Sequence, residues 1–194
     1  MAHYEYDFTI DEDFYEKAII EHLCDSQDYV HLYGPDVARS TEEYRDVFLL
    51  DILSSALERI NKRLPRAAAE EAILKIGNVE GGTLAQRNEV FNDYLQSGVE
   101  VRYFDGKEER DDIVYLIDFD DPENNDFHVV NQWTFVEYSE KRPDVIIFVN
   151  GMPLVMFELR VLRARKWMLP MPTCSFGRTC SIFQAFSFPT FFAS

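Results

Sequence analysis

The spacing of apolar and polar residues predicts helices in the first half of the chain. Apolar residues recur at helical intervals over residues 12–24, and Asp11 just before them is a suitable N-cap. The same period is found over residues 40–62, 66–76 and 82–97. We therefore expect four helices before residue 98.

The period changes after Gly98, where apolar residues begin to alternate with polar ones. This alternation predicts strands over residues 99–104, 113–119, 127–137, 145–149 and 154–159. The last two flank Asn150-Gly151, a pair typical of hairpins. Helices followed by strands indicate an α+β fold, with a mixed, mainly antiparallel sheet flanked by helices.

The predicted hairpin carries a carboxylate at each open end, Asp144 and Glu158. Carboxylates among apolar neighbours are costly unless something neutralises them, and Mg²⁺ typically takes one or two protein carboxylates. The two residues are an even number of positions apart, so they share a sheet face only if the loop is odd in length. We therefore expect a three-residue connection, with a left-handed Gly151 and a bulge, instead of a two-residue Asn-Gly turn. An irregular strand start at Asp144 is the alternative.

A longer pattern around this hairpin is more specific than the two acids. It consists of Asn131-Gln132-Trp133-Thr134, Arg142-Pro143-Asp144, Asn150-Gly151 with Pro153-Leu154, and Glu158-Leu159. Over residues 8–159 the chain resembles the N-terminal nuclease domain of type I restriction enzyme R subunits (HsdR), a member of the PD-(D/E)xK superfamily.

The resemblance implies a restriction-endonuclease-like core in which Asp144 and Glu158 hold Mg²⁺. The ion would polarise the scissile phosphate and lower the pKa of an attacking water. Glu16 on the first helix is the candidate for a third metal carboxylate, with Glu21 second; the alternative for Glu16 is a solvated helix face. Gln132 would support the site, or serve as a plain strand amide.

The implied function is that of a type I site-specific deoxyribonuclease, with Mg²⁺-dependent hydrolysis of double-stranded DNA. Its expected partners are the methyltransferase and specificity subunits of a type I restriction complex. ATP would be used only by helicase domains that this chain lacks, since the glycine-bearing stretch 77–82 has no Lys-Ser/Thr of a phosphate-binding loop.

The chain departs from the family pattern at the third catalytic position, where Arg160 stands in place of Lys. Arg keeps a positive charge but cannot act as a base. All 35 acidic residues lie before Leu159, whereas residues 159–194 hold five basic residues, six of the 16 Phe and two of the three Cys. We therefore expect residues 1–159 to form the nuclease domain and residues 160–194 to be an aberrant tail.

The genetic code offers an explanation for this tail. One permitted set of codons for residues 160–180, preceded by a single added A, reads in the shifted frame as Lys-Ser-Pro, then an acidic turn and an amphipathic helix with a Gln. A one-base deletion at the Lys codon would therefore produce the tail; an evolved or designed tail is the alternative.

Either way we expect a truncated chain that is inactive as written. The alternative function is a catalytically dead nuclease-like module that docks to the methyltransferase-specificity complex.

Charge and composition add limits to this interpretation. The net charge of −16 is unfavourable for DNA binding unless basic groups are concentrated locally or supplied by other domains. Three cysteines without metal-like spacing suggest a reducing compartment, the cytoplasm, and no apolar run is long enough to span a membrane. The four histidines are scattered, and we expect each to be a structural or surface residue.

Overall fold

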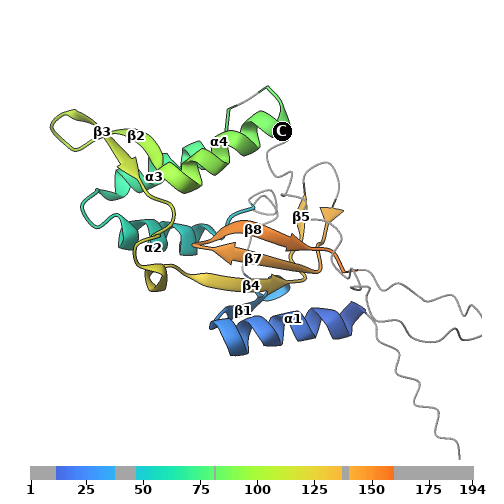
Figure 1. Cartoon of the computed structure of the whole chain (residues 1–194). Helices are drawn as coiled ribbons and strands as arrows, with labels where there is room; N and C mark the ends of the chain where they lie inside the picture. Colours follow the sequence, from blue (N-terminus) through green and yellow to red (C-terminus); the bar gives the residue numbers. More distant parts are fainter. Residues whose placement is uncertain (1–11, 38–46, 81, 137–139, 160–194) are drawn as a thin grey trace, which may run out of the picture.

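The computed structural model describes residues 12–37, 47–80, 82–136 and 140–159 (Figure 1). The elements of these ranges are α1 (Glu12–Gln27), β1 (Val30–Tyr33), the 3-10 turn Gly34–Asp36, α2 (Leu50–Ile60), α3 (Arg66–Gly77), α4 (Leu84–Ser97), β2 (Val99–Phe104), β3 (Glu109–Val114), the 3-10 turn Pro122–Asn124, β4 (Phe127–Asn131), β5 (Phe135–Val136), β6 (Glu140–Lys141), β7 (Val145–Val149) and β8 (Met152–Phe157). None of the helices in these ranges is long and apolar enough to cross a membrane.

A four-stranded sheet in the order β1-β4-β7-β8 forms the centre of the fold. β1 runs parallel to β4, and the β4–β7 and β7–β8 pairs are antiparallel. This is the mixed, mainly antiparallel sheet that the sequence predicted. Figure 1 shows α1 running along one side of the sheet, where Ile20 packs on Val129 and Val145.

The opposite face of the sheet is covered by the entry to α2 and by Trp133. The buried residues of this second cluster are Leu49, Val130, Trp133, Ile146 and Phe148. The Trp133 and Phe148 rings meet edge to face, with their centroids 5.4 Å apart. Alternate residues of β4 and β7 thus enter different cores, because neighbouring side chains of a strand point to opposite faces.

A second layer is built from α2, α3, α4 and the β2–β3 ribbon. Its core contains Leu53 and Leu57 of α2, Ile76 of α3 and alternate residues of β2 such as Val99 and Val101. Because Leu49 and Ile52 contribute to the sheet cluster, the start of α2 joins this layer to the sheet. α4 begins with a capping box, in which Thr83 and Gln86 satisfy each other's backbone amides.

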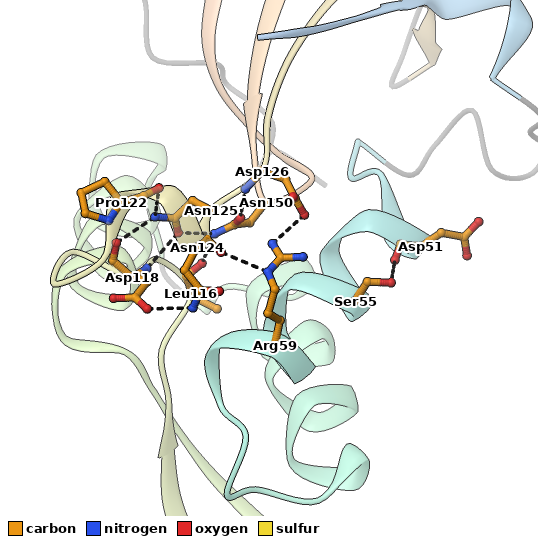
Figure 2. Close-up of polar contacts among 10 residues, drawn as sticks. All are labelled: Asp51, Ser55, Arg59, Leu116, Asp118, Pro122, Asn124, Asn125, Asp126 and Asn150. Atoms are coloured by element: carbon orange, nitrogen blue, oxygen red, sulfur yellow. Dashed lines mark hydrogen bonds and ion pairs between the residues drawn. The ribbon is translucent and has the colours of Figure 1, made fainter. Parts of the chain in front are cut away.

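A buried polar network fixes the β7–β8 turn to this layer (Figure 2). The Asn150 side chain accepts a hydrogen bond from the Asp126 backbone amide and donates to the Leu116 carbonyl and to Asn125 Oδ1, at 2.8–2.9 Å. Arg59 of α2 reaches the same loop, where it forms an ion pair of 2.7 Å with Asp126. The Asn-Gly pair of the sequence pattern is therefore a structural anchor.

The predicted helices over residues 12–24, 66–76 and 82–97 are confirmed as α1, α3 and α4. The helix expected over 40–62 begins at Leu50 in the described part of the chain; its first residues and the Asp11 cap lie outside that part. Val47–Leu49 are not helical, because the Leu49 amide donates to the Gly151 carbonyl at 2.8 Å instead of entering a helical turn.

Three strand predictions were wrong in their extent, and two strands, β1 and β6, were missed. The strand expected over 154–159 is β8, Met152–Phe157. β3 covers residues 109–114 instead of 113–119, since cross-strand contacts such as Arg102–Asp111 hold a charged ribbon that propensity disfavours. The strand expected over 127–137 stops at Asn131 and resumes only at Phe135. β1 has four residues, and three of them are exposed. Its sequence therefore lacks the alternation of buried and exposed positions from which a strand is predicted.

Candidate active site

The β7–β8 hairpin turns through two residues, not through the three that the sequence predicted. Asn150 and Gly151 both have positive φ angles, 50° and 79°, and Val149 pairs directly with Met152. The left-handed Gly151 is confirmed. Its closeness to α2 also requires glycine, since a Cβ there would lie 2.6 Å from the Leu49 carbonyl oxygen.

A β-bulge in β8 corrects the register that the short turn would otherwise give. Phe148 pairs with Pro153, but the next residue of β7, Ile147, pairs with Val155, which leaves Leu154 as the extra residue. The expected bulge is therefore present, inside β8 and not at the turn. Beyond it Val145 pairs with Phe157, the last pair of the two strands, and continuing this register by one residue sets Asp144 opposite Glu158.

Asp144 and Glu158 differ in their exposure to solvent. Asp144 is partly buried, and its carboxylate accepts a hydrogen bond from the Leu159 backbone amide. Glu158 is exposed. The hydrogen bond holds the chain beyond β8 alongside the start of β7. Arg160 and the tail that follows it lie outside the described residues.

Glu16 lies at the same end of the sheet and holds two amides there. Asn131 Nδ2 donates to Glu16 Oε1 at 2.6 Å, and Gln132 Nε2 donates to Glu16 Oε2 at 3.3 Å. On the other side of the Asn131 amide, His31 Nε2 lies 2.9 Å from Asn131 Oδ1. Glu21, the second candidate, is exposed on the same helix. The structure thus brings Glu16 and Gln132 together, as two of the predicted site residues.

Gln132 has an unusual backbone that explains how both amides reach one carboxylate. In an extended strand Asn131 and Gln132 would point to opposite faces. Gln132 has a φ of 55°, which breaks that alternation at the end of β4. The turn also needs Gly34, because a Cβ on Gly34 would lie 2.7 Å from the Gln132 carbonyl oxygen. Backbone conformations of this kind are typical of functional sites.

The predicted set of three metal carboxylates is not assembled in the part of the chain that the structure describes. No three His, Cys, Asp or Glu side chains there lie close enough to hold one ion. The reason is the pleat of the sheet: Val145 and Phe157 face α1, so by alternation Asp144 and Glu158 belong to the opposite face, away from Glu16.

The remaining pair, Asp144 and Glu158, fits a divalent cation on the chemistry of its donors. Two opposed carboxylates, one of them open to water, match the preference of Mg²⁺ for one or two protein oxygens with several waters retained. Both residues stand at the open end of the hairpin.

One titratable side chain of the sheet, that of His128, is partly shielded from water. His128 of β4 is half-buried, and burial lowers its pKa below the ordinary value of 6.5, although the charge of Asp126 opposes this shift. Its Nδ1 atom is buried with no hydrogen-bond partner. His128 is thus a structural histidine, as the sequence suggested.

The sequence did not single out Asn131 and His31 as members of the site. Asn131 stood in the quoted pattern, but its partner Glu16 is 115 positions away in the chain. His31 belongs to β1, a strand that the sequence analysis missed. The amide pair Asn131-Gln132, inside the strand expected over 127–137, was the one available signal.

Comparison of the sequence with known proteins finds a matching family and two relatives. The family described as the N terminus of type I restriction enzyme R proteins matches residues 9–166. A protein of Methanocaldococcus jannaschii named for the endonuclease subunit of type I restriction enzyme MjaIXP is 29% identical over 152 residues, 75% of this chain and 14% of the relative. The type I restriction enzyme HindI endonuclease subunit of Haemophilus influenzae is 35% identical over 116 residues, 59% of this chain and 11% of the relative.

Proposed function

Since the chain belongs to the family of N-terminal domains of type I restriction enzyme R proteins, we propose that its site is built for Mg²⁺-dependent hydrolysis of DNA phosphodiesters. The observation that carries the proposal is the bulged register of β8, which sets Asp144 opposite Glu158. An ordinary two-residue hairpin would place the two carboxylates on opposite faces of the sheet.

The proposed site uses few residues. Asp144 and Glu158 would hold the ion, and Leu159 fixes one oxygen of Asp144 through its backbone amide. When bound, the ion would polarise the scissile phosphate and lower the pKa of the attacking water. Glu158 is the more exposed of the two acids, so it borders the space that water and DNA must enter.

Arg160 limits what the site can do. A guanidinium at this position would offer a positive charge to the developing phosphate charge, but it would not accept a proton from water at neutral pH. We propose that this chain has little or no nuclease activity, and that a one-base deletion at codon 160 produced its tail. The family match ends at residue 166, a few residues into the acid-free tail. Sequencing the coding DNA tests the deletion, and an intact frame with an unrelated tail would disprove it.

The partners follow from the family. The chain covers 14% and 11% of the two relatives, so the remainder of such a subunit would carry the helicase activity that uses ATP. A net charge of −16 implies that most phosphate contacts come from those other regions. The partners would be double-stranded DNA and the methyltransferase and specificity subunits, in the cytoplasm.

A second candidate function is favoured by Arg160 itself. A nuclease-like domain without its Lys could serve only to dock onto the methyltransferase-specificity complex. A nicking assay on supercoiled DNA with Mg²⁺ separates the two functions, comparing this chain with a version in which Arg160→Lys is combined with the restored reading frame. Nicking by the restored version alone supports the nuclease. No nicking by either version, with retained binding to the partner complex, supports the docking module.

A further inference from the structure

The end of β4 is held by a set of side chains for which the proposed reaction has no direct use. Glu16 of α1, Asn131 of β4 and His31 of β1 are linked in a row by hydrogen bonds of 2.6 and 2.9 Å. We propose that these three residues form a positioning unit that fixes Gln132 and the β4 end beside Asp144. This inference rests on the proposed metal site but assigns Glu16 a role other than metal ligand.

The chemistry of the groups determines the direction of each hydrogen bond. A carboxylate only accepts, so the Asn131 and Gln132 amide nitrogens must face Glu16. Asn131 Oδ1 is then directed at His31, which must carry a proton on Nε2 to donate to it. Each of these three hydrogen bonds thus joins a donor to an acceptor, and the orientation of the Asn131 amide is fixed from both sides.

The pairing of β4 with β7 connects the fixed Asn131 side chain to the proposed metal site. Asn131 pairs with Val145, so the next residues outward on the two strands are Gln132 and Asp144. Gln132 has a left-handed backbone, which the close approach of Gly34 and the hydrogen bond to Glu16 hold in place. Releasing Glu16 would free this strained residue to relax and would disturb the strand that flanks Asp144.

The position of Glu16 argues against direct coordination. It contacts Asn131 on the face of the sheet covered by α1, whereas the strand alternation places Asp144 and Glu158 on the other face. Outer residues that orient a metal site typically change metal affinity by about 10–100-fold when they are altered. A positioning unit therefore predicts a loss of affinity that can be restored without returning a carboxylate to position 16.

The test is a reciprocal exchange of groups in the full chain. In Glu16→Gln, the new amide nitrogen faces the amide nitrogen of Asn131 or of Gln132, and one hydrogen bond is lost. Adding Asn131→Asp restores all of them: the Gln at position 16 donates to the new Asp and accepts from Gln132, and His31 donates to the Asp as well. Asp25→Asn, an exposed change on the same helix, is the control.

Mn²⁺ affinity measured by titration calorimetry is the first readout. We expect Glu16→Gln to raise the dissociation constant about tenfold, the double variant to return it close to the parent value, and Asp25→Asn to leave it unchanged. A double variant as weak as the single one would overturn the positioning role and indicate that Glu16 is itself a ligand. Glu158→Gln should abolish binding in any case.

Hydrogen exchange without metal is the second readout, and it remains decisive if the parent chain binds no Mn²⁺. Backbone amides over residues 129–136 and 142–147 should exchange faster in Glu16→Gln and return to the parent rate in the double variant. Unchanged exchange in the single variant overturns the positioning unit. Absence of Mn²⁺ binding together with the expected exchange pattern contradicts the metal site alone.

Discussion

The backbone amide of Leu159 donates a hydrogen bond to the carboxylate of Asp144, and this contact joins the two open ends of the β7–β8 hairpin. It is possible only because Leu154 is an extra residue in β8. One bulge thus decides which face of the sheet receives Glu158, and with it whether the two acids can share an ion.

The opposition of Asp144 and Glu158 predicts a disulfide. Residues directly opposite each other on antiparallel strands have Cβ atoms about 4.5–5.5 Å apart, close to the reach of a disulfide. With the native cysteines replaced by Ser, Asp144→Cys combined with Glu158→Cys should cross-link under mild oxidation. Asp144→Cys with Phe157→Cys, which places the thiols on opposite faces, should not. Non-reducing mass spectrometry distinguishes them, and the reverse result would show that the bulge does not set the register.

Gly151→Ala should destabilise the protein strongly. An Ala there would combine a left-handed backbone with a Cβ 2.6 Å from the Leu49 carbonyl oxygen. We expect the free energy of unfolding to fall by about 2–4 kcal/mol, from backbone strain and overpacking together. Gly106→Ala is the matched control, because its φ of 94° is equally unusual but nothing lies within 4 Å. It should cost about 1 kcal/mol. Equal losses in urea unfolding would contradict the packing of α2 on the turn.

Asn150→Gly should remove the side-chain network while leaving the turn conformation unstrained. Three groups would lose a partner, namely the Leu116 carbonyl, Asn125 Oδ1 and the Asp126 amide. Because buried groups without partners cost about 1–3 kcal/mol each, and some relax toward water, we expect a loss of about 2–4 kcal/mol. Asn78→Gly, at an exposed helix end, should change stability by about 0.5 kcal/mol. Thermal unfolding of both variants measures the difference.

His128 predicts a dependence of stability on pH. Its pKa in the fold is lower than the ordinary value of 6.5, so the unfolded chain binds more protons as the pH falls. Its contribution is therefore neutral above the ordinary pKa and becomes destabilising as the pH drops through and below it. Urea unfolding at about pH 7.5 and pH 5.5 should show a smaller decline for His128→Leu than for the parent. Parallel declines would assign the effect to other groups.

Local patterns predicted the parts of this fold that depend on near neighbours. Helical spacing identified α1, α3 and α4, and Asn150-Gly151 located the hairpin turn. What the sequence could not supply depends on contacts between distant segments. The bulge at Leu154 depends on how β7 and β8 pair. β1 forms because its exposed segment hydrogen-bonds to the edge of β4.

The candidate site was predictable to the same extent. Asp144 and Glu158 were proposed from a pattern within one hairpin, and Glu16 and Gln132, both proposed for the site, are joined by a hydrogen bond in the structure. The sequence did not place Glu16 on the other face, because that depends on how α1 docks. His31 was expected only to be a structural or surface residue, since its partner Asn131 is 100 positions away in the chain.

The buried Asn150-Gly151 turn has a consequence for the chemical ageing of the protein. An asparagine followed by glycine is the sequence in which the side-chain amide is most readily attacked by the next backbone nitrogen, which converts Asn to Asp through a cyclic imide. In the folded chain the Asn150 amide is fully buried and fixed by hydrogen bonds to the loop, so it cannot rotate into the attacking geometry. Deamidation at this position would therefore record how often the hairpin end opens, and each event would place a negative charge against the Leu116 carbonyl and hinder its closing again.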